Sequence, residues 1–125
     1  MIEFRADGSP VPQGSMKVIN GRVLHSQGSA LAVWRSTIAF NAKLAGATPL
    51  DGAMEIQMVF IMPRPKTVKR THPTVAPDLD KLVRAVLDAL TNICYLDDAQ
   101  VTDIRACKIY GNSPGVEIRL TQKIF

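Results

Sequence analysis

The feature that most constrains the fold is an apolar stripe of helical spacing between residues 79 and 91. The stripe consists of Leu79, Leu82, Val83, Val86, Leu87 and Leu90, and it predicts an amphipathic helix. Such a helix has to bury its apolar side against another apolar surface. Residues 53–62 provide one, because their alternation predicts a strand whose buried face carries Met54, Ile56, Met58, Phe60 and Met62.

Shorter signals predict the remaining elements. In chain order these are a strand at 2–6, a hairpin at 17–25, a helix at 29–45, and strands at 100–110 and 116–120. The hairpin depends on Asn20-Gly21, a strong turn signal, and Gly46 ends the first helix. The order β-β-β-α-β-α-β-β predicts an α+β fold (α/β mixed), in which two main helices pack on a small mixed β-sheet.

The chain has 125 residues, 46% of them apolar, which suits a single domain over residues 1–125 that folds without disulfides or a structural metal. No apolar run approaches the roughly 18 residues of a membrane span, and the N-terminal MIEFRADG does not resemble a signal peptide. We therefore expect a soluble, cytoplasmic protein with no membrane partner. Cys94 and Cys107 lack the Cys-x-x-Cys spacing of zinc sites and are expected to be free thiols.

The formal net charge of +4 conceals two oppositely charged parts of the chain. Residues 78–103 contain six acids, all of them aspartate, and two bases, Lys81 and Arg84, so this segment carries −4 and the other 99 residues carry +8. A generic solvated surface would mix glutamate with aspartate. A cluster of short carboxylates in a basic protein instead favours metal coordination beside a polyanion.

Two pairs of aspartates carry this argument. Asp78 and Asp80 lie at the start of the predicted helix, where an extended backbone would point both side chains the same way. Asp97 and Asp98 precede the next strand, and the chain reversal after the helix can bring the two pairs within reach. Converging carboxylates repel one another unless a cation lies between them, and Mg²⁺ combines a few carboxylates with water and phosphate. The pattern predicts the metal site of a phosphodiester hydrolase.

The same residues have a purely structural interpretation. The first pair of aspartates suits a helix N-terminus, and the second pair suits a turn between a helix and a strand. Arg84 lies four residues from both Asp80 and Asp88. This spacing fits an exposed ladder of helix ion pairs as well as a guanidinium that holds a phosphate beside a metal.

A long loop at residues 63–77 joins the apolar strand to the helix and contains four prolines. Arg64, Lys66, Lys69 and Arg70 give its first half the composition of an arm that contacts DNA phosphates. The alternative is that these bases only keep the protein in solution, because a basic patch by itself is a weak signal.

Residues 77–108, PDLDKLVRAVLDALTNICYLDDAQVTDIRACK, resemble the signature of the RusA-type Holliday junction resolvases. D-x-D at a helix start, D-A-L near the end of that helix and D-D-A-Q-V at the following strand occur in the family's order and approximate spacing. A PVPQGS opening, a first helix, an apolar strand and a loop rich in proline and bases are similar to the phage-type branch of this family.

The resemblance implies a homodimeric endodeoxyribonuclease that depends on Mg²⁺ or Mn²⁺ and resolves four-way (Holliday) DNA junctions by symmetric nicks, in recombination and repair. The family's metal-binding acids fall on Asp78, Asp80 and Asp98, and Asp97 ranks below its neighbour. The family's lysine on this helix is replaced by Arg84, which joins the catalytic residues as a phosphate contact, with Lys81 close by.

Two other functions are compatible with these residues. A non-catalytic DNA-binding module would use its aspartates only as caps and turns, and removing metal would leave its function unchanged. A metal-dependent nuclease for flaps or other branched DNA would share the site and differ in substrate.

Overall fold

The computed structural model describes residues 1–14, 16–19, 22–25 and 28–124. Its elements, in chain order, are β1 (Ile2–Asp7), β2 (Met16–Ile19), β3 (Arg22–His25), α1 (Gly28–Leu44), β4 (Met54–Pro63), α2 (Leu79–Leu90), the short 3₁₀ helix η1 (Asp98–Gln100), β5 (Val101–Gly111) and β6 (Gly115–Gln122). Apart from η1, this is the order that the sequence predicts, and the predicted α+β fold is confirmed.

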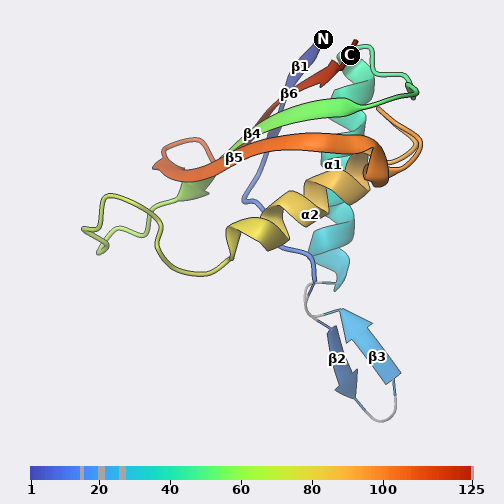
Figure 1. Cartoon of the computed structure of the whole chain (residues 1–125). Coiled ribbons are helices and arrows are strands. Elements are labelled where there is room, and N and C mark those ends of the chain that lie inside the picture. The colour runs from blue at the N-terminus through green and yellow to red at the C-terminus, as the bar shows by residue number, and fades with distance from the viewer. Residues whose placement is uncertain (15, 20–21, 26–27, 125) are drawn as a thin grey trace.

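Four strands form a mixed sheet in the order β1-β6-β4-β5 (Figure 1). β6 pairs antiparallel with β1 and with β4, whereas β4 and β5 run parallel. Parallel neighbours need a crossover connection, and the segment that contains α2 supplies it. The predicted hairpin is confirmed by the antiparallel pairing of β2 with β3 in a separate sheet, and its Asn20-Gly21 turn lies outside the described residues.

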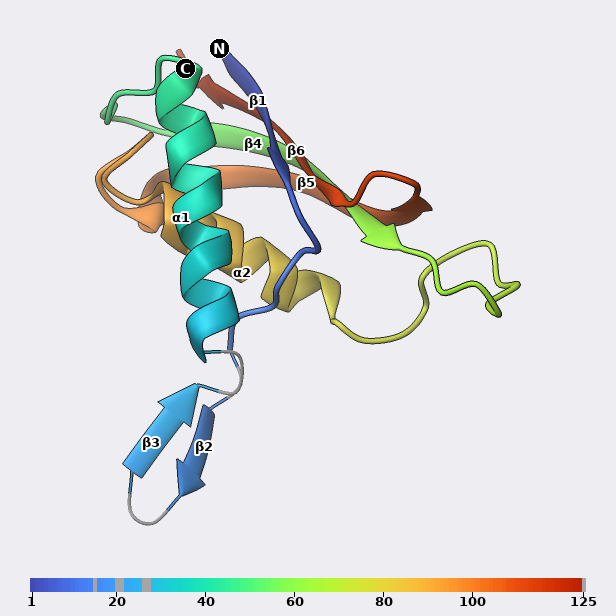
Figure 2. The ribbon, with the colours of Figure 1, turned by 180° about the vertical axis from the view of Figure 1, so that it is seen from behind.

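Both helices pack on one face of the four-stranded sheet, as Figures 1 and 2 show from opposite sides. The predicted alternation of β4 is confirmed, since its inward residues Met54, Ile56, Met58, Phe60 and Met62 are all buried. α2 contributes its apolar stripe to the same core. This packing leaves the opposite side of α2 free to carry polar side chains.

α1 is apolar on two sides. One side, which includes Trp34, is buried against the core. On the other side Val33, Phe40 and Leu44 are 67%, 60% and 69% exposed, and Figure 2 shows α1 in front of the sheet. Even so, the described ranges contain no helix with the length and apolar character needed to span a membrane.

The two cysteines are free thiols, as the sequence predicts, but their surroundings differ. Cys94 is fully buried, and burial raises the pKa of its thiol to about 11. Its neighbour Tyr95 is buried as well, and its hydroxyl donates to the Leu87 carbonyl at 2.6 Å. Burial also raises the pKa of the Tyr95 phenol. Cys107, by contrast, is exposed on β5.

Candidate active site

The first pair of predicted acids lies where the chain enters α2. Asp78 is the N-cap residue and has an extended backbone (φ −68°, ψ 140°), whereas Asp80 already belongs to the first turn. The expectation of an extended Asp78-Leu79-Asp80 segment therefore holds only for its first residue, because α2 begins at Leu79. The Asp78 side chain makes no capping hydrogen bond; its Oδ2 lies 3.5 Å from Lys81 Nζ. The capping interpretation of Asp78 is thus not supported.

Lys108, a residue that the sequence analysis missed, holds the backbone just before Asp78. Its Nζ donates to the carbonyl oxygens of Val75 at 2.7 Å and Pro77 at 2.8 Å. Lys108 pairs in register with the buried Phe60, so its side chain leaves β5 on the face that the helices cover. The sequence contains a signal for this role, because Lys108 occupies a position of its strand whose side chain points to the core side of the sheet.

The two acids of the second pair, Asp97 and Asp98, differ in their hydrogen bonds. Asp97 caps η1: its Oδ1 accepts from the Ala99 amide at 2.9 Å, and Gln100 Oε1 accepts from the Asp97 amide at 3.0 Å. The same glutamine donates through Nε2 to the Leu50 carbonyl at 2.8 Å. Asp97 therefore has the structural role of a helix cap, whereas the Asp98 side chain does not cap η1.

The pKa of the Asp98 carboxyl is raised above its usual range. Loss of hydration raises this pKa, and the nearby charge of Asp88 and a hydrogen bond with Asp97 raise it further. The Arg84 guanidinium acts in the opposite direction. Asp98 therefore lies in the electrostatic field of the polar side of α2, where its negative charge is incompletely compensated.

Asp88, which the sequence places in the D-A-L element and on the polar face of the helix but not among the predicted metal ligands, joins the candidate site. A hollow of about 500 Å³ is lined by Asp88, Asp97 and Asp98 together with Arg35 of α1. Asp88 also accepts a hydrogen bond from Gln13 Nε2. Within the described residues, neither Asp80 nor Asp88 forms an ion pair with Arg84, so the predicted ladder is absent from this part of the chain.

The segment before β2 runs along this side of α2. The Gln13 amide donates to the Lys81 carbonyl at 3.0 Å, and Gly14 lies against the Arg84 side chain. A Cβ at position 14 would lie 3.2 Å from Arg84 Nη1, and φ of +136° at this residue also favours glycine. The segment at residues 10–14 (PVPQG) therefore packs against the polar side of α2 and holds it in place.

The structure does not gather the predicted metal ligands at one point. Asp98 lines the same hollow as Asp88. Asp80 and Asp78 lie roughly 12 and 15 Å before Asp88 along the axis of α2, because a helix rises about 1.5 Å per residue. Within residues 1–14, 16–19, 22–25 and 28–124, no group of three or more His, Cys, Asp or Glu side chains could hold a metal ion. The acids form a row along α2 rather than a preformed three-carboxylate site.

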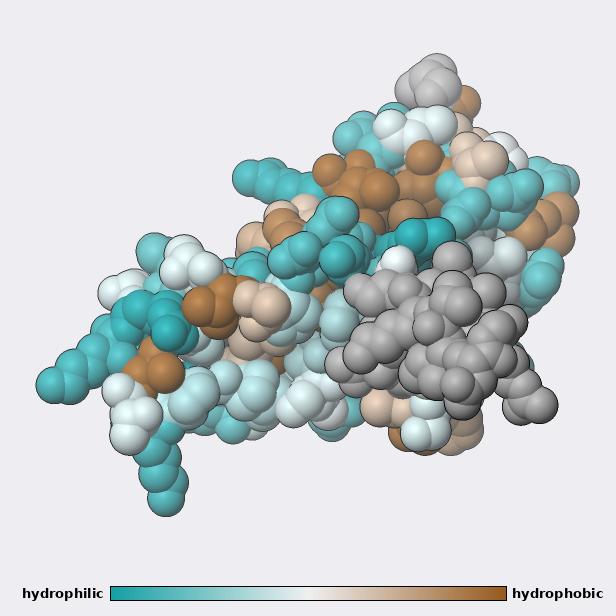
Figure 3. All heavy atoms as spheres, turned by 90° about the horizontal axis from the view of Figure 1, so that it is seen from below, coloured by the Kyte–Doolittle hydropathy of each residue, from teal (hydrophilic) through white to brown (hydrophobic). Residues whose placement is uncertain are grey.

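The basic loop is attached to the end of β5. Arg70 Nη1 donates to the Tyr110 hydroxyl at 2.7 Å, and the Arg64 guanidinium carbon lies 4.7 Å from the centre of the Tyr110 ring. Lys66 and Lys69 lie between Arg64 and Arg70 in the chain, and both are exposed. Figure 3 shows hydrophilic side chains projecting from the end of the molecule where this loop lies.

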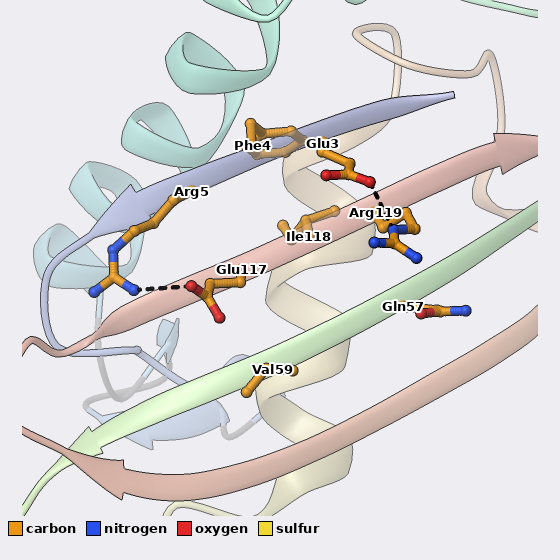
Figure 4. A pocket seen from close by; sticks show the side chains of 8 residues that line it. All are labelled: Glu3, Phe4, Arg5, Gln57, Val59, Glu117, Ile118 and Arg119. Carbon is orange, nitrogen blue, oxygen red and sulfur yellow. Dashed lines mark hydrogen bonds and ion pairs between the residues drawn. The ribbon is translucent and has the colours of Figure 1, made fainter.

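Another hollow lies on the sheet face opposite the helices (Figure 4). It measures about 510 Å³, and its charged side chains are already paired: Arg119 with Glu3 at 2.9 Å and Arg5 with Glu117 at 3.5 Å. Both carboxylates of this hollow have arginine partners. We therefore assign the chemistry to the α2–η1 region, whose hollow has a similar volume.

Comparison with known proteins gives two matches. The family described as Endodeoxyribonuclease RusA matches residues 7–121, which is most of the chain. The chain is also similar to the "Uncharacterized protein YqaN" of Bacillus subtilis (strain 168), with 29% identity over 136 aligned positions that cover 97% of this chain and 96% of that protein. The family match includes α2, η1 and the basic loop, and therefore the acids and bases of the candidate site.

Proposed function

Because the chain belongs to the RusA endodeoxyribonuclease family, we propose that it cleaves four-way (Holliday) DNA junctions by metal-dependent phosphodiester hydrolysis, in DNA recombination and repair. The observation that carries this proposal is the hollow in which Asp98 of η1 lies beside Asp88 on the polar side of α2. The charges of Asp88 and Arg84 both act on the Asp98 carboxyl, whose pKa is raised. Uncompensated carboxylates beside an arginine are suited to bind a cation together with a phosphate.

We assign Mg²⁺, or Mn²⁺ in its place, to Asp78, Asp80 and Asp98. The chemistry of the donors fits such an ion, because all three are carboxylates and a cation would relieve the repulsion around Asp98. Their arrangement does not form one shared site, so in this geometry an ion would be held by Asp78 and Asp80 or by Asp98, and not by all three together. Mg²⁺ is commonly held by one or two carboxylates plus waters and substrate phosphate, so a preformed cage of three acids is not required. When bound, a divalent ion lowers the pKa of water and offsets the charge that develops on the phosphate.

The chain's own residues have distinct tasks in this mechanism. Arg84 holds the scissile phosphate through its guanidinium, whose planar fork of N–H donors matches the oxygens of a phosphate. Lys81 lies beside the Asp78 carboxylate and limits its movement. Lys108 fixes the backbone that leads into Asp78, and the Gln13 bond to Asp88 fixes the other end of the acidic row.

DNA binding is assigned to Arg64, Lys66, Lys69 and Arg70. Proteins that neutralise phosphates release counterions, so affinity for the junction should fall steeply as salt concentration rises. The docking of Arg64 and Arg70 on Tyr110 supports this assignment, because it orders the arm at low entropic cost before DNA arrives.

A homodimer is part of the proposal, since symmetric cuts in a two-fold junction suit a two-fold enzyme. The exposed Val33, Phe40 and Leu44 of α1 support it, because a dimer needs apolar surface to bury. Light scattering on the purified protein should give twice the mass of one chain, and a monomeric mass at micromolar concentration would remove this part of the proposal.

The decisive experiment compares cleavage of four-way junctions, flaps and linear duplex, with Mg²⁺ and with EDTA. We expect cleavage of the junction only, and only with metal; Asp80→Asn should lose it while retaining junction binding. Preference for flaps would favour the branched-DNA nuclease instead. Unchanged function in EDTA would favour the non-catalytic DNA-binding module.

A further inference from the structure

A small apolar pocket lies between the basic loop and the end of the sheet, and the mechanism above leaves it without a role. Its volume is about 180 Å³, and its walls include Pro63, Pro65, Pro73, Val75, Pro77 and Tyr110. We call it the proline pocket. An apolar cavity of about 150 Å³ is large enough to hold benzene, so the proline pocket has room for one aromatic ring system.

Cations surround the proline pocket. Arg70 and Lys108 contribute to its lining, and Arg64 lies over the ring of Tyr110. These three side chains are oriented by bonds to the Tyr110 hydroxyl, to the Val75 and Pro77 carbonyls, and to the Tyr110 ring. An apolar interior with a cationic rim matches a ligand that has a flat apolar part joined to an anion.

The proline pocket is adjacent in sequence to the proposed catalytic acids. Pro77, one of its walls, immediately precedes Asp78, and the Lys108 bond to the Pro77 carbonyl joins the two regions. A nucleotide whose phosphate is near Asp78 therefore has its base within reach of the pocket. Taking a base out of the stack costs least where pairing is already disturbed, and the exchange of strands at a four-way junction interrupts the continuous duplex.

We propose that the proline pocket receives an unstacked DNA base from a nucleotide beside the scissile phosphate. The base packs against proline rings and Tyr110, and Arg64 and Arg70 bind the adjoining phosphates. Stacking on an aromatic side chain tolerates any base, whereas the limited volume favours one size over another. The proposal rests on the proposed nuclease function and adds to it a contact that positions the substrate strand.

The test is a thermodynamic cycle between the protein and the DNA, measured as junction binding in EDTA. An abasic nucleotide is placed beside the cut site, and binding is compared for the wild type, for Val75→Trp, which fills the pocket, and for Val75→Ala, which does not. Val75 is 47% exposed, so neither change should disturb the core. Loss of the base should weaken wild-type and Val75→Ala binding by roughly 5- to 100-fold, as loss of one base–aromatic stack does.

In Val75→Trp the same abasic nucleotide should change affinity less than twofold, because the pocket is already occupied. Ile124→Trp, at an exposed position after the end of β6 that has no proposed role, is the matched control and should behave as the wild type. Equal abasic effects in Val75→Trp and wild type would overturn the pocket proposal while leaving the nuclease proposal intact. A wild-type protein that neither binds nor cuts branched DNA would instead overturn the proposed function itself.

Discussion

The Nζ atom of Lys108 lies 2.8 Å from the carbonyl oxygen of Pro77, the residue immediately before Asp78. Through this bond the edge strand β5 fixes the start of α2, although the two residues are 31 positions apart in the chain. The position of a proposed metal ligand is therefore set by a side chain on a different element.

Replacing Lys108 with Met should disturb this connection while keeping the length of the side chain. Hydrogen bonds to charged groups contribute about 1.5–3 kcal/mol, so we expect the free energy of unfolding to fall by about 1–3 kcal/mol. Misplacement of Asp78 should lower the rate of junction cleavage by about 10- to 100-fold and raise the Mg²⁺ concentration needed for half-maximal rate. Single-turnover cleavage over a Mg²⁺ series measures both.

Lys123→Met is the matched control for Lys108→Met. Lys123 pairs with Asp103 at 3.0 Å near the other end of the sheet, so its loss removes a similar charge without touching α2. A cleavage defect of equal size in both variants would mean that Lys108 acts only through net charge.

Asp97 and Asp98 should respond in opposite ways to substitution. Asp97→Ala removes the cap of η1 and should lower the free energy of unfolding by about 0.5–2 kcal/mol. Asp98→Asn removes an acid whose pKa is raised by its surroundings, so stability should be unchanged or slightly higher while metal-dependent cleavage is lost. Urea unfolding and cleavage assays on both variants test this pair, and a stability loss confined to Asp98→Asn would contradict it.

The basic loop should divide into two classes of residue. Lys66→Ala combined with Lys69→Ala should weaken junction binding and reduce the slope of log affinity against log salt by about 2, because two phosphate contacts are lost. Tyr110→Phe removes only the hydroxyl that Arg70 contacts, so it should weaken binding and leave the wild-type slope nearly intact. Fluorescence anisotropy at several salt concentrations measures these slopes; an unchanged slope in the double lysine variant would remove the arm from the DNA interface.

The two thiols should differ in reactivity in the folded protein. Cys107 should react with a thiol reagent at pH 8, whereas Cys94 should react only on unfolding, because it is buried and burial raises its pKa to about 11. Between pH 9 and 11 the unfolded chain releases the Cys94 proton while the folded chain keeps it, so stability should decrease by up to about 1.4 kcal/mol per pH unit.

Tyr95, whose pKa is also raised by burial, should add to this alkaline loss at higher pH. Thermal unfolding of the wild type and of Cys94→Ala across this pH range separates the two contributions. Stability that stays constant up to pH 11 in the wild type would show that Cys94 is accessible to solvent in the native state.

Local patterns in the sequence were sufficient to predict the fold. The alternation of β4 and the apolar stripe of α2 report directly which side of each element is buried, since side-chain direction follows from the backbone period. The Asn20-Gly21 signal likewise predicted the pairing of β2 with β3. The family signature, D-x-D, D-A-L and D-D-A-Q-V, lies within the residues that the RusA match covers.

The sequence by itself therefore determined the elements, the α+β class and the family of this protein, because these depend on neighbouring residues. Only the tertiary structure decided which acids have structural partners: Asp97 caps η1, the Asp78 side chain makes no capping hydrogen bond, and Asp98 lines a hollow with Asp88. The structure alone also revealed the Lys108 contact with Pro77. Such contacts join residues distant in the chain, and their geometry is set by how α2 packs between its sheet and the preceding loop, which no local period encodes.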